Sequence, residues 1–335
     1  MLNFFRSNNL GVVFATAVLI LLYRVLYFFH PLDIGYVFHH AEPAAKLFMR
    51  ILHINAKTPL ILLLTGGGLL CFLEALLINR IVNSYKVASK KNYLGGLLFV
   101  VFTSLVPECM VISPALIATL ILLSCISNLF ELAKPEKLSS QIFDLGFLSG
   151  LAMLFYFPAI YFLPFVFIGF FMMRSVTLRE ALMIFTGFFS IMLIVFTIYF
   201  WSDSLPEMVL DMVNLQYRIQ LSFSKLTHWQ IAILSWLIFL SLWVLASVPG
   251  LLFSTVIQIR KYISLLIIGA ALSLLIIPLA FNLNLSHLLF IITSLCILYA
   301  VYFVETKTNL ITEILFIVLI LSVFIFEYLP LFVTI

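Results

Sequence analysis

Long apolar segments separated by short polar loops recur along the whole chain. Eleven of them are long enough, or nearly so, to cross about 30 Å of hydrocarbon as helices. They lie at about 10–30, 59–83, 93–113, 115–133, 143–157, 158–174, 180–201, 229–257, 262–281, 286–304 and 309–331. The pattern predicts an all-α polytopic membrane protein with about 11 transmembrane helices in a single integral membrane domain, residues 1–335.

The least regular stretch runs from Phe143 to Arg174. It contains Pro158 and Pro164, and proline breaks or kinks a helix because it lacks a backbone N–H. This stretch could therefore form two short tilted helices or one broken hairpin.

Two of the connecting loops are long, at about 31–57 and 202–228. In the first, apolar residues recur at helical spacing opposite basic positions. In the second, Ser204 and Glu207 have the spacing of a capping box before further apolar residues. We expect an amphipathic helix on the membrane surface in each loop, which places these helices in the first and fourth outer loops.

Composition and charge support a membrane location. Of the 335 residues, 64% are hydrophobic and 10% are charged, a balance that soluble proteins of this size do not show. The net charge of +4 comes from scattered residues that form no basic stripe, so nucleic-acid binding is not expected. Twelve of the 18 Lys and Arg residues lie in loops on one side and five on the other. The positive-inside rule then predicts a cytoplasmic N-terminus.

No metal or cofactor is expected. The four Cys residues lie inside apolar segments without metal-binding spacing, and we interpret them as small core residues. His39 and Glu42 approach a metal-binding spacing, but a zinc site normally needs a third protein ligand. The run Gly66 to Gly68 follows no predicted strand, so close helix approach explains it better than a nucleotide loop.

Ionisable residues within apolar segments are the most informative positions, because burying a charge in a bilayer is costly. Arg24 lies about two-thirds of the way along the first segment, and Glu108 follows Pro107 near the outer end of the third. Both fall at similar depth, which predicts a buried Arg24–Glu108 ion pair. The pair could be purely structural, Arg24 could hold an anionic head group while Glu108 positions it, or the two residues could lie apart and never meet.

A second group of polar residues falls in the inner half of the membrane. Asn79 and Asn83 are four positions apart and share one helix face. Glu74, Asn128 and Asp144 lie near them in the expected topology. We interpret these five as a structural polar cluster that joins helices through hydrogen bonds, with a cytoplasmic ligand site as the alternative.

The first outer loop has the densest collection of reactive side chains. His30, Asp33, His39, His40, Glu42 and His53 fall within it. An Asp or Glu just outside the first span is what a general base needs if an acceptor docks at the outer face. Asp33 is the first candidate for that role and Glu42 the second, with solvated loop carboxylates as the alternative interpretation.

The segment from about 74 to 190 resembles a family of multi-pass inner-membrane proteins of Bacteroidota that has no established activity. The residues that carry the resemblance include Asn79, Asn83, Pro107, Glu108, Asp144, Tyr156 and Gly187. The resemblance implies the inner membrane of a Gram-negative bacterium.

The layout is also similar to that of C-type polyprenyl-sugar glycosyltransferases. These enzymes have one span, then a long outer loop with surface helices and a catalytic acid, then many closely spaced spans. The resemblance implies that Asp33 or Glu42 takes the place of the acid, with Arg24, His39 or Arg50 near a lipid-linked phosphate. The first outer loop lacks the paired acids that several such families have, which sets this chain apart from them.

Two functions follow from these observations. One is a glycosyltransferase-like protein of the cell envelope that binds a polyprenyl-phosphate-linked sugar at the outer face. The other is a non-catalytic subunit or assembly partner of an envelope complex, contacting membrane lipids and another membrane protein. A transporter is disfavoured, because the chain shows no internal repeat and its buried charges lie toward the two faces of the membrane.

Overall fold

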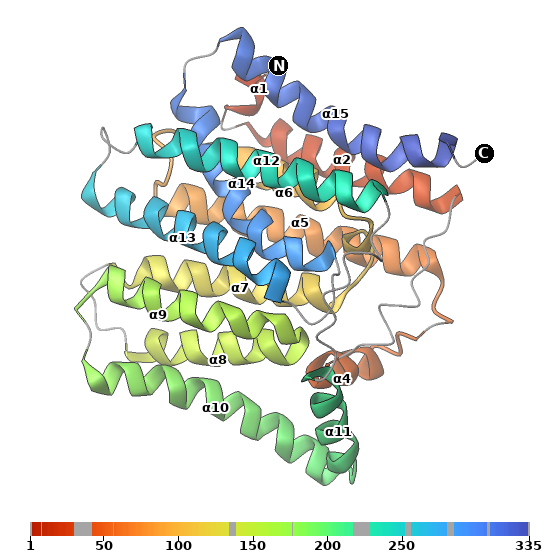
Figure 1. Ribbon diagram of the computed structural model, residues 1–335, viewed down its shortest axis with the longest axis vertical. Coiled ribbons are helices and arrows are strands. Elements are labelled where there is room, and N and C mark those ends of the chain that lie inside the picture. Colours follow the sequence, from red (N-terminus) through yellow and green to blue (C-terminus); the bar gives the residue numbers. More distant parts are fainter. Residues whose placement is uncertain are drawn as a thin grey trace.

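The computed structural model describes a helical bundle (Figure 1). The described residues are 2–7, 9–29, 42–55, 57–133, 139–175, 177–216, 228–251, 256–279, 285–306 and 309–333. Within these ranges every regular element is an α-helix or a 3₁₀ turn. The prediction of an all-helical chain is confirmed for this part of the protein.

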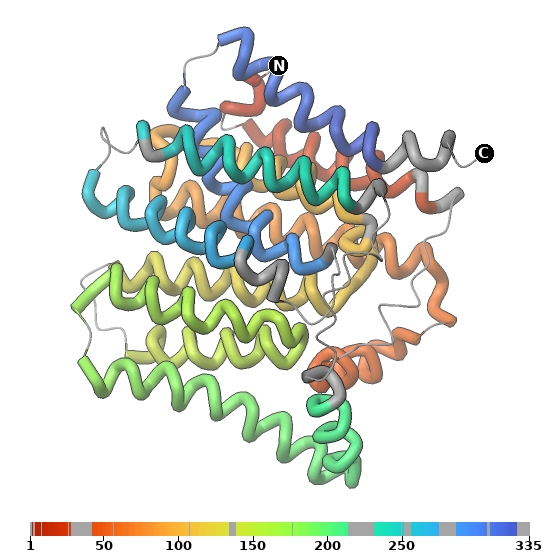
Figure 2. The backbone as a smooth tube through the Cα atoms, viewed as in Figure 1, coloured from red at the N-terminus to blue at the C-terminus, as the bar shows by residue number. Residues whose placement is uncertain are grey.

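Most helices run side by side, and the chain passes back and forth between the two ends of the bundle (Figure 2). The α-helices are α1 (Leu2–Phe5), α2 (Leu10–Phe29), α4 (Pro43–Ile51), α5 (Leu60–Ser84), α6 (Leu94–Thr103), α7 (Pro114–Glu131), α8 (Ser139–Phe155), α9 (Phe162–Met173), α10 (Leu178–Trp201), α11 (Leu205–Gln216), α12 (His228–Leu251), α13 (Ile257–Leu279), α14 (Leu288–Glu305) and α15 (Leu310–Val333). In the described ranges three 3₁₀ turns interrupt them: η1 (Pro107–Cys109), η2 (Phe157–Tyr161) and η5 (Leu285–His287).

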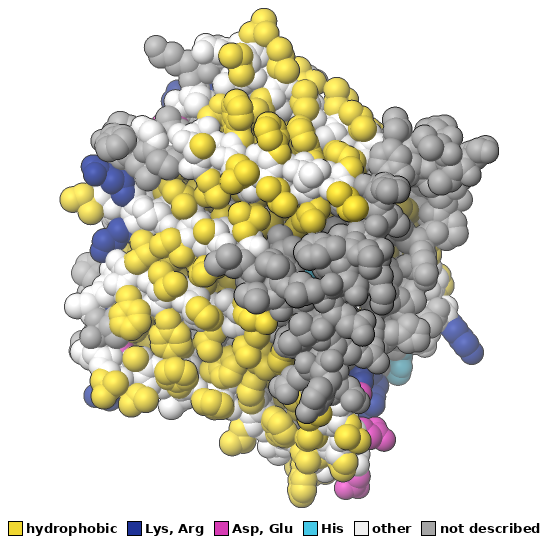
Figure 3. Space-filling model, in the orientation of Figure 1, with side chains coloured by type: hydrophobic (Ala, Val, Ile, Leu, Met, Phe, Trp, Pro, Cys, Tyr) yellow, Lys and Arg dark blue, Asp and Glu magenta, His cyan; other side chains and the backbone are white. Residues whose placement is uncertain are grey.

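The outer surface of the bundle is suited to lipid. Within the described ranges, six helices are long and apolar enough to cross a membrane, and five shorter helical segments are also apolar. Figure 3 shows hydrophobic side chains spread over the described part of one face, with Lys and Arg at its left edge and at its right and lower right. On α10, for example, Phe189, Leu193 and Phe200 are exposed. Large exposed apolar surfaces are unfavourable in water, so the chain is a helical membrane protein.

The central helix is α14. Every residue from Leu288 to Phe303 is buried, as expected for a helix that is apolar on all sides. It packs against α6, α7, α12 and α13. The main apolar core extends from Leu2 on α1 to Val323 on α15. All four Cys residues are buried and free, which confirms their interpretation as core residues.

Prolines accompany two breaks between helices, one of them inside a single expected segment. The helix expected over 93–113 ends at Thr103, and the chain turns through η1, which begins at Pro107. The stretch with Pro158 and Pro164 forms two helices, α8 and α9, joined by η2. Each break leaves backbone groups without helical partners, so side chains can bind there.

The helices predicted in the two long loops are α4 and α11, which lie across one end of the bundle (Figure 1). The Tyr199 hydroxyl donates a hydrogen bond of 2.9 Å to the Pro43 carbonyl, which fixes the start of α4 to α10. Lys46 and Asp211 form an ion pair between α4 and α11. The two helices also share a small apolar cluster, which includes Ala44 of α4, Met208 of α11 and Ile191 of α10.

Candidate functional site

The three 3₁₀ turns and the start of α4 meet through a set of polar side chains. We name this set the junction cluster: Glu42, Glu108, Tyr156, Ser286 and His287. Each member precedes, begins or lies within a break between helices. The turns η1 and η5 contact each other. One hydrogen bond joins His287 of η5 to Tyr156, and another joins the Phe157 N–H to Glu42, which precedes α4. The cluster therefore lies near the end of the bundle that carries α4 (Figure 1).

Glu42 precedes α4 as its N-cap residue and is 5% exposed. Its Oε1 accepts a hydrogen bond of 3.1 Å from the backbone N–H of Phe157. Burial raises the pKa of Glu42 to about 7, although this hydrogen bond, the residue's own N–H and the charge of Lys46 act in the opposite direction. A carboxyl group with a pKa near neutrality can take up and release a proton at physiological pH.

The raised pKa of Glu42 makes a prediction about stability. Between its ordinary value of 4.5 and about 7, the folded chain keeps a proton that the unfolded chain releases. The contribution of Glu42 to stability is thus greatest below about pH 4.5 and falls as the pH rises toward 7, by about 3 kcal/mol in total. A Glu42→Gln variant lacks this loss, so its melting temperature should match that of the unaltered chain at pH 4.5 and exceed it at pH 8. Parallel melting curves at both pH values would contradict the assignment.

Tyr156 and His287 form a buried pair. The Tyr156 hydroxyl lies 2.6 Å from His287 Nδ1, and both side chains are at most 9% exposed. When the neutral imidazole carries its proton on Nε2, the phenol donates this hydrogen bond and Nδ1 accepts it; in the other tautomer the roles reverse. Tyr156 also interacts electrostatically with Glu42 and Glu108. It therefore lies close to both carboxyl groups of the cluster.

Glu108 is held at the start of α14. Its Oε2 accepts hydrogen bonds from the Ser286 backbone N–H at 3.0 Å and from the Ser286 hydroxyl at 2.6 Å. Ser286 lies in η5, which leads directly into α14. A carboxylate is stabilised at a helix N-terminus by the free N–H groups and the helix dipole. This contact gives a physical reason for an acidic residue in an otherwise apolar segment.

The predicted ion pair between Arg24 and Glu108 is not formed. Arg24 is 3% exposed, and its Nε donates a hydrogen bond of 3.1 Å to the Met110 carbonyl. Its Nη1 donates a longer one, 3.4 Å, to the carbonyl of Ile20. Because the helix ends before Pro107, the Met110 carbonyl has no helical partner. It accepts the hydrogen bond from the Arg24 guanidinium, which the sequence predicts to pair with the Glu108 carboxylate. The two residues lie on adjoining segments but use different partners.

The glycine run on α5 makes this arrangement possible. A Cβ on Gly67 would lie 2.6 Å from the Met110 carbonyl oxygen, and one on Gly68 would lie 3.4 Å from Arg24 Nε. The Ile112 N–H donates to the Leu63 carbonyl at 3.1 Å, which anchors the same segment to α5. The prediction of close approach is confirmed, and the partners are both the 110–112 segment and α2.

The five residues predicted as an inner polar cluster have different environments. Asn79 Oδ1 accepts from the Gly96 N–H at 2.8 Å, and Asn83 exchanges two hydrogen bonds with the backbone of Asn92. These two amides join α5 to α6 and to the loop before it. Glu74 is fully buried without such a partner, Asn128 is half-buried on α7, and Asp144 is exposed on α8. No hydrogen bond in the described ranges joins Asn128 or Asp144 to the two amides.

The remaining predicted residues lie in the first outer loop. Asp33 and His39 fall outside the described residues. Arg50 is exposed in the last turn of α4 and interacts electrostatically with Tyr199. In the part of the chain that the structure describes, no group of three or more His, Cys, Asp or Glu residues is arranged to hold a metal.

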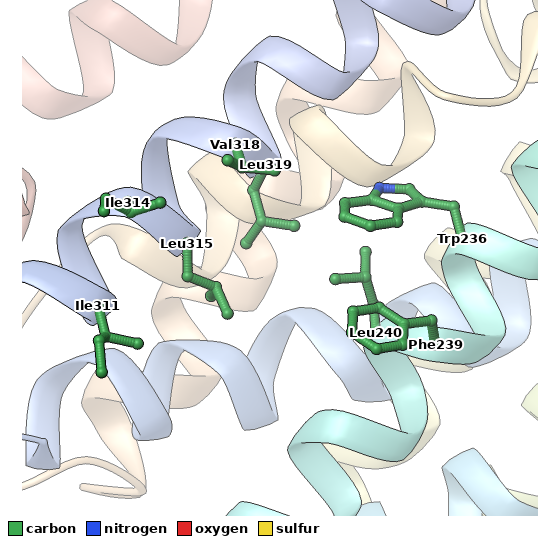
Figure 4. A pocket seen from close by; sticks show the side chains of 8 residues that line it. All are labelled: Trp236, Phe239, Leu240, Ile311, Ile314, Leu315, Val318 and Leu319. Carbon is green, nitrogen blue, oxygen red and sulfur yellow. The ribbon is translucent and has the colours of Figure 1, made fainter.

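An apolar groove lies between α12 and α15, and no residue of the junction cluster lines it (Figure 4). It has a volume of about 320 Å³, and its walls include Trp236, Phe239, Leu315 and Leu319. A lining of this kind fits a hydrocarbon chain but offers almost no polar group to a reaction. The junction cluster is the better candidate for chemistry.

Comparison of the chain with protein-family models, with curated proteins and with solved structures gave no match. The candidate site therefore depends on its own geometry.

Sequence reasoning missed three cluster members as site residues: Tyr156, Ser286 and His287. The available signals were weak. Tyr156 lies two positions before Pro158, and Ser286 and His287 directly precede an apolar run. Polar residues at such positions are also ordinary helix-start residues.

Proposed function

We propose that this protein crosses the inner membrane of a Gram-negative bacterium eleven times, with its N-terminus in the cytoplasm. The six long and five shorter apolar segments supply eleven spans, and the distribution of Lys and Arg favours this orientation. In this topology α4, α11 and the junction cluster lie at the outer face. The two short helices then lie in the membrane interface.

We further propose that the protein is a glycosyltransferase-like enzyme of the cell envelope, acting on a polyprenyl-phosphate-linked sugar. The observation that carries the proposal is the buried carboxyl group of Glu42, whose pKa is raised to about 7. Ionised Glu42 takes the proton of an acceptor hydroxyl, and the hydroxyl oxygen bonds to C1 of the sugar. The bond from C1 to the phosphate oxygen breaks, and polyprenyl phosphate leaves with the electron pair. Asp33, in the same loop, is a second candidate for the base.

The phosphate of the carrier is assigned to Arg50. Arg24 is 3% exposed and donates to two backbone carbonyl oxygens inside the bundle, so it does not face a head group at the surface. Arg50 is exposed on α4, the helix that Glu42 precedes. Its guanidinium can bind two phosphate oxygens at once. His39, which precedes α4 in sequence, is a further candidate for this contact.

The alternative is a non-catalytic membrane subunit in which the same cluster only joins helices. One observation favours it: Glu42 and Glu108 each accept a hydrogen bond from a backbone N–H at the start of a helical segment. Carboxylates in this position stabilise a fold without any reaction. The alternative also requires a membrane-protein partner that remains bound in mild detergent.

A sugar-transfer experiment distinguishes the two proposed functions. The purified chain, reconstituted in liposomes containing undecaprenyl-phosphate-linked radiolabelled hexose, should transfer or release the sugar. The rate should rise with pH through about 7, because Glu42 must lose its proton to act as a base. No transfer or release at any pH, together with a stably bound protein partner, would support the non-catalytic subunit.

A further inference from the structure

Glu74 lies deep in the bundle with no hydrogen-bond partner for its carboxylate. It is fully buried on α5, and neither oxygen accepts a hydrogen bond from any described residue. The buried hydroxyl of Ser104, at the end of the neighbouring helix α6, also lacks a partner in the described part of the chain. Buried carboxylates are almost always hydrogen-bonded, because an unsolvated charge is very unfavourable. The unpartnered carboxylate of Glu74 therefore requires an explanation.

Arg24 is the basic residue that interacts with Glu74. It interacts electrostatically with Glu74, yet its hydrogen bonds go to the Met110 and Ile20 carbonyls and to Cys71. No ion pair within 4.0 Å joins Arg24 to Glu74 among the described residues. Two groups that attract each other across a gap wider than a direct hydrogen bond are commonly bridged by water.

The surroundings of Glu74 supply few other partners. Among the described residues, four elements contribute the groups that interact with it electrostatically: Arg24 from α2, Cys71 from α5, Cys109 from η1 and Cys296 from α14. The Cys71 sulfur and the Thr103 hydroxyl of α6 lie 3.3 Å apart. Thiols are weak hydrogen-bond donors, so they do not replace the solvation that an ionised carboxylate needs.

We propose that Arg24 and Glu74 form a buried ion pair bridged by bound water, in a hydrated site between α2, α5 and η1. The ligand of this site is one or a few water molecules, each donating to a Glu74 oxygen and accepting from the guanidinium. The water satisfies the carboxylate, and the pairing keeps Arg24 from being an uncompensated charge within the membrane. This inference stands independently of the proposed function.

Radiolytic hydroxyl-radical footprinting tests for the water in the unaltered chain. Bound water exposed to X-rays produces radicals that modify side chains next to it. Cys71 and Cys125 are both fully buried and free, but Cys125, on α7, contacts the Leu145 carbonyl instead of this site. We expect Cys71 to be modified severalfold faster than Cys125. Equal and slow modification of both would show a dry site and overturn the proposal.

A double-mutant cycle tests for the pair. Arg24→Met and Glu74→Gln should each lower the melting temperature, because each leaves one buried charge without its partner, and the double variant should recover most of the loss. If Arg24→Met does not fold, Glu74→Gln and Arg24→Lys serve instead, and Arg24→Lys should retain more stability than Glu74→Gln. The pairing would be refuted if the losses in melting temperature of the two single variants added up in the double variant. It would also be refuted if Arg24→Lys and Glu74→Gln lowered the melting temperature equally. Strong coupling with an inert Cys71 would indicate direct contact and refute the bridging water.

Discussion

Replacing Glu42 with Gln should lower the rate of sugar transfer by about 10²- to 10⁴-fold, the usual contribution of a general base. Gln has nearly the same shape and keeps an oxygen to accept the hydrogen bond from the Phe157 N–H, so the local structure should persist. It cannot take a proton from an acceptor hydroxyl. The measurement is the initial rate of transfer from undecaprenyl-phosphate-linked hexose in liposomes, at equal protein abundance and at pH 8.

Two control variants make this result specific. Glu42→Asp keeps a proton acceptor but shortens the side chain, so it should retain more activity than Glu42→Gln. Glu207→Gln removes an exposed carboxylate from the first turn of α11 and should leave the rate unchanged. Full activity in Glu42→Gln would exclude Glu42 as the base and leave Asp33 as the candidate. A similar loss in Glu207→Gln would point to the charge of the outer surface instead.

Replacing Gly146 with Ala should destabilise the protein by about 3 kcal/mol or more, the upper end of the usual cost of overpacking. A Cβ at this position would lie 1.8 Å from the Ile184 carbonyl oxygen of α10, which is backbone and cannot move aside. The contact is reciprocal, because a Cβ on Gly187 would lie 2.2 Å from the Phe143 carbonyl oxygen of α8. The two helices must separate to admit either methyl group. Thermal unfolding in detergent should show a clear fall in melting temperature.

Gly250→Ala is the matched control for this prediction. Gly250 is exposed near the end of α12, and a Cβ there would meet no atom within 4 Å. Alanine favours a helix over glycine by about 1 kcal/mol, so this variant should be neutral or slightly more stable. If both variants had the same melting temperature, α8 and α10 would not approach as closely as described.

Some elements follow directly from the sequence. Apolar length and scarcity of charge identify the membrane helices, because a bilayer rejects unpaired backbone groups and charges wherever they occur. The helices α4 and α11 follow from amphipathic spacing and local capping signals. Gly66 to Gly68 indicate a close approach because only a residue without a side chain admits a backbone at that distance. All of these are local properties that a short window of sequence contains.

The partners of the buried polar groups do not follow from the sequence. Depth along each span suggested Arg24 with Glu108, yet Arg24 is bonded to the Met110 carbonyl and Glu108 to Ser286. The break at Pro107 freed that carbonyl, and residue 286 came into reach only through the packing of η5 against η1. Likewise Tyr156 and His287, 131 positions apart, form one pair.

The sequence alone determined that this is a helical membrane protein and which segments are apolar enough to form its helices, because those properties depend on local hydrophobicity. Only the tertiary structure decided which polar group meets which. Hydrogen bonds require atoms to lie within about 3 Å, and no linear pattern fixes the rotation and offset of neighbouring helices to that accuracy.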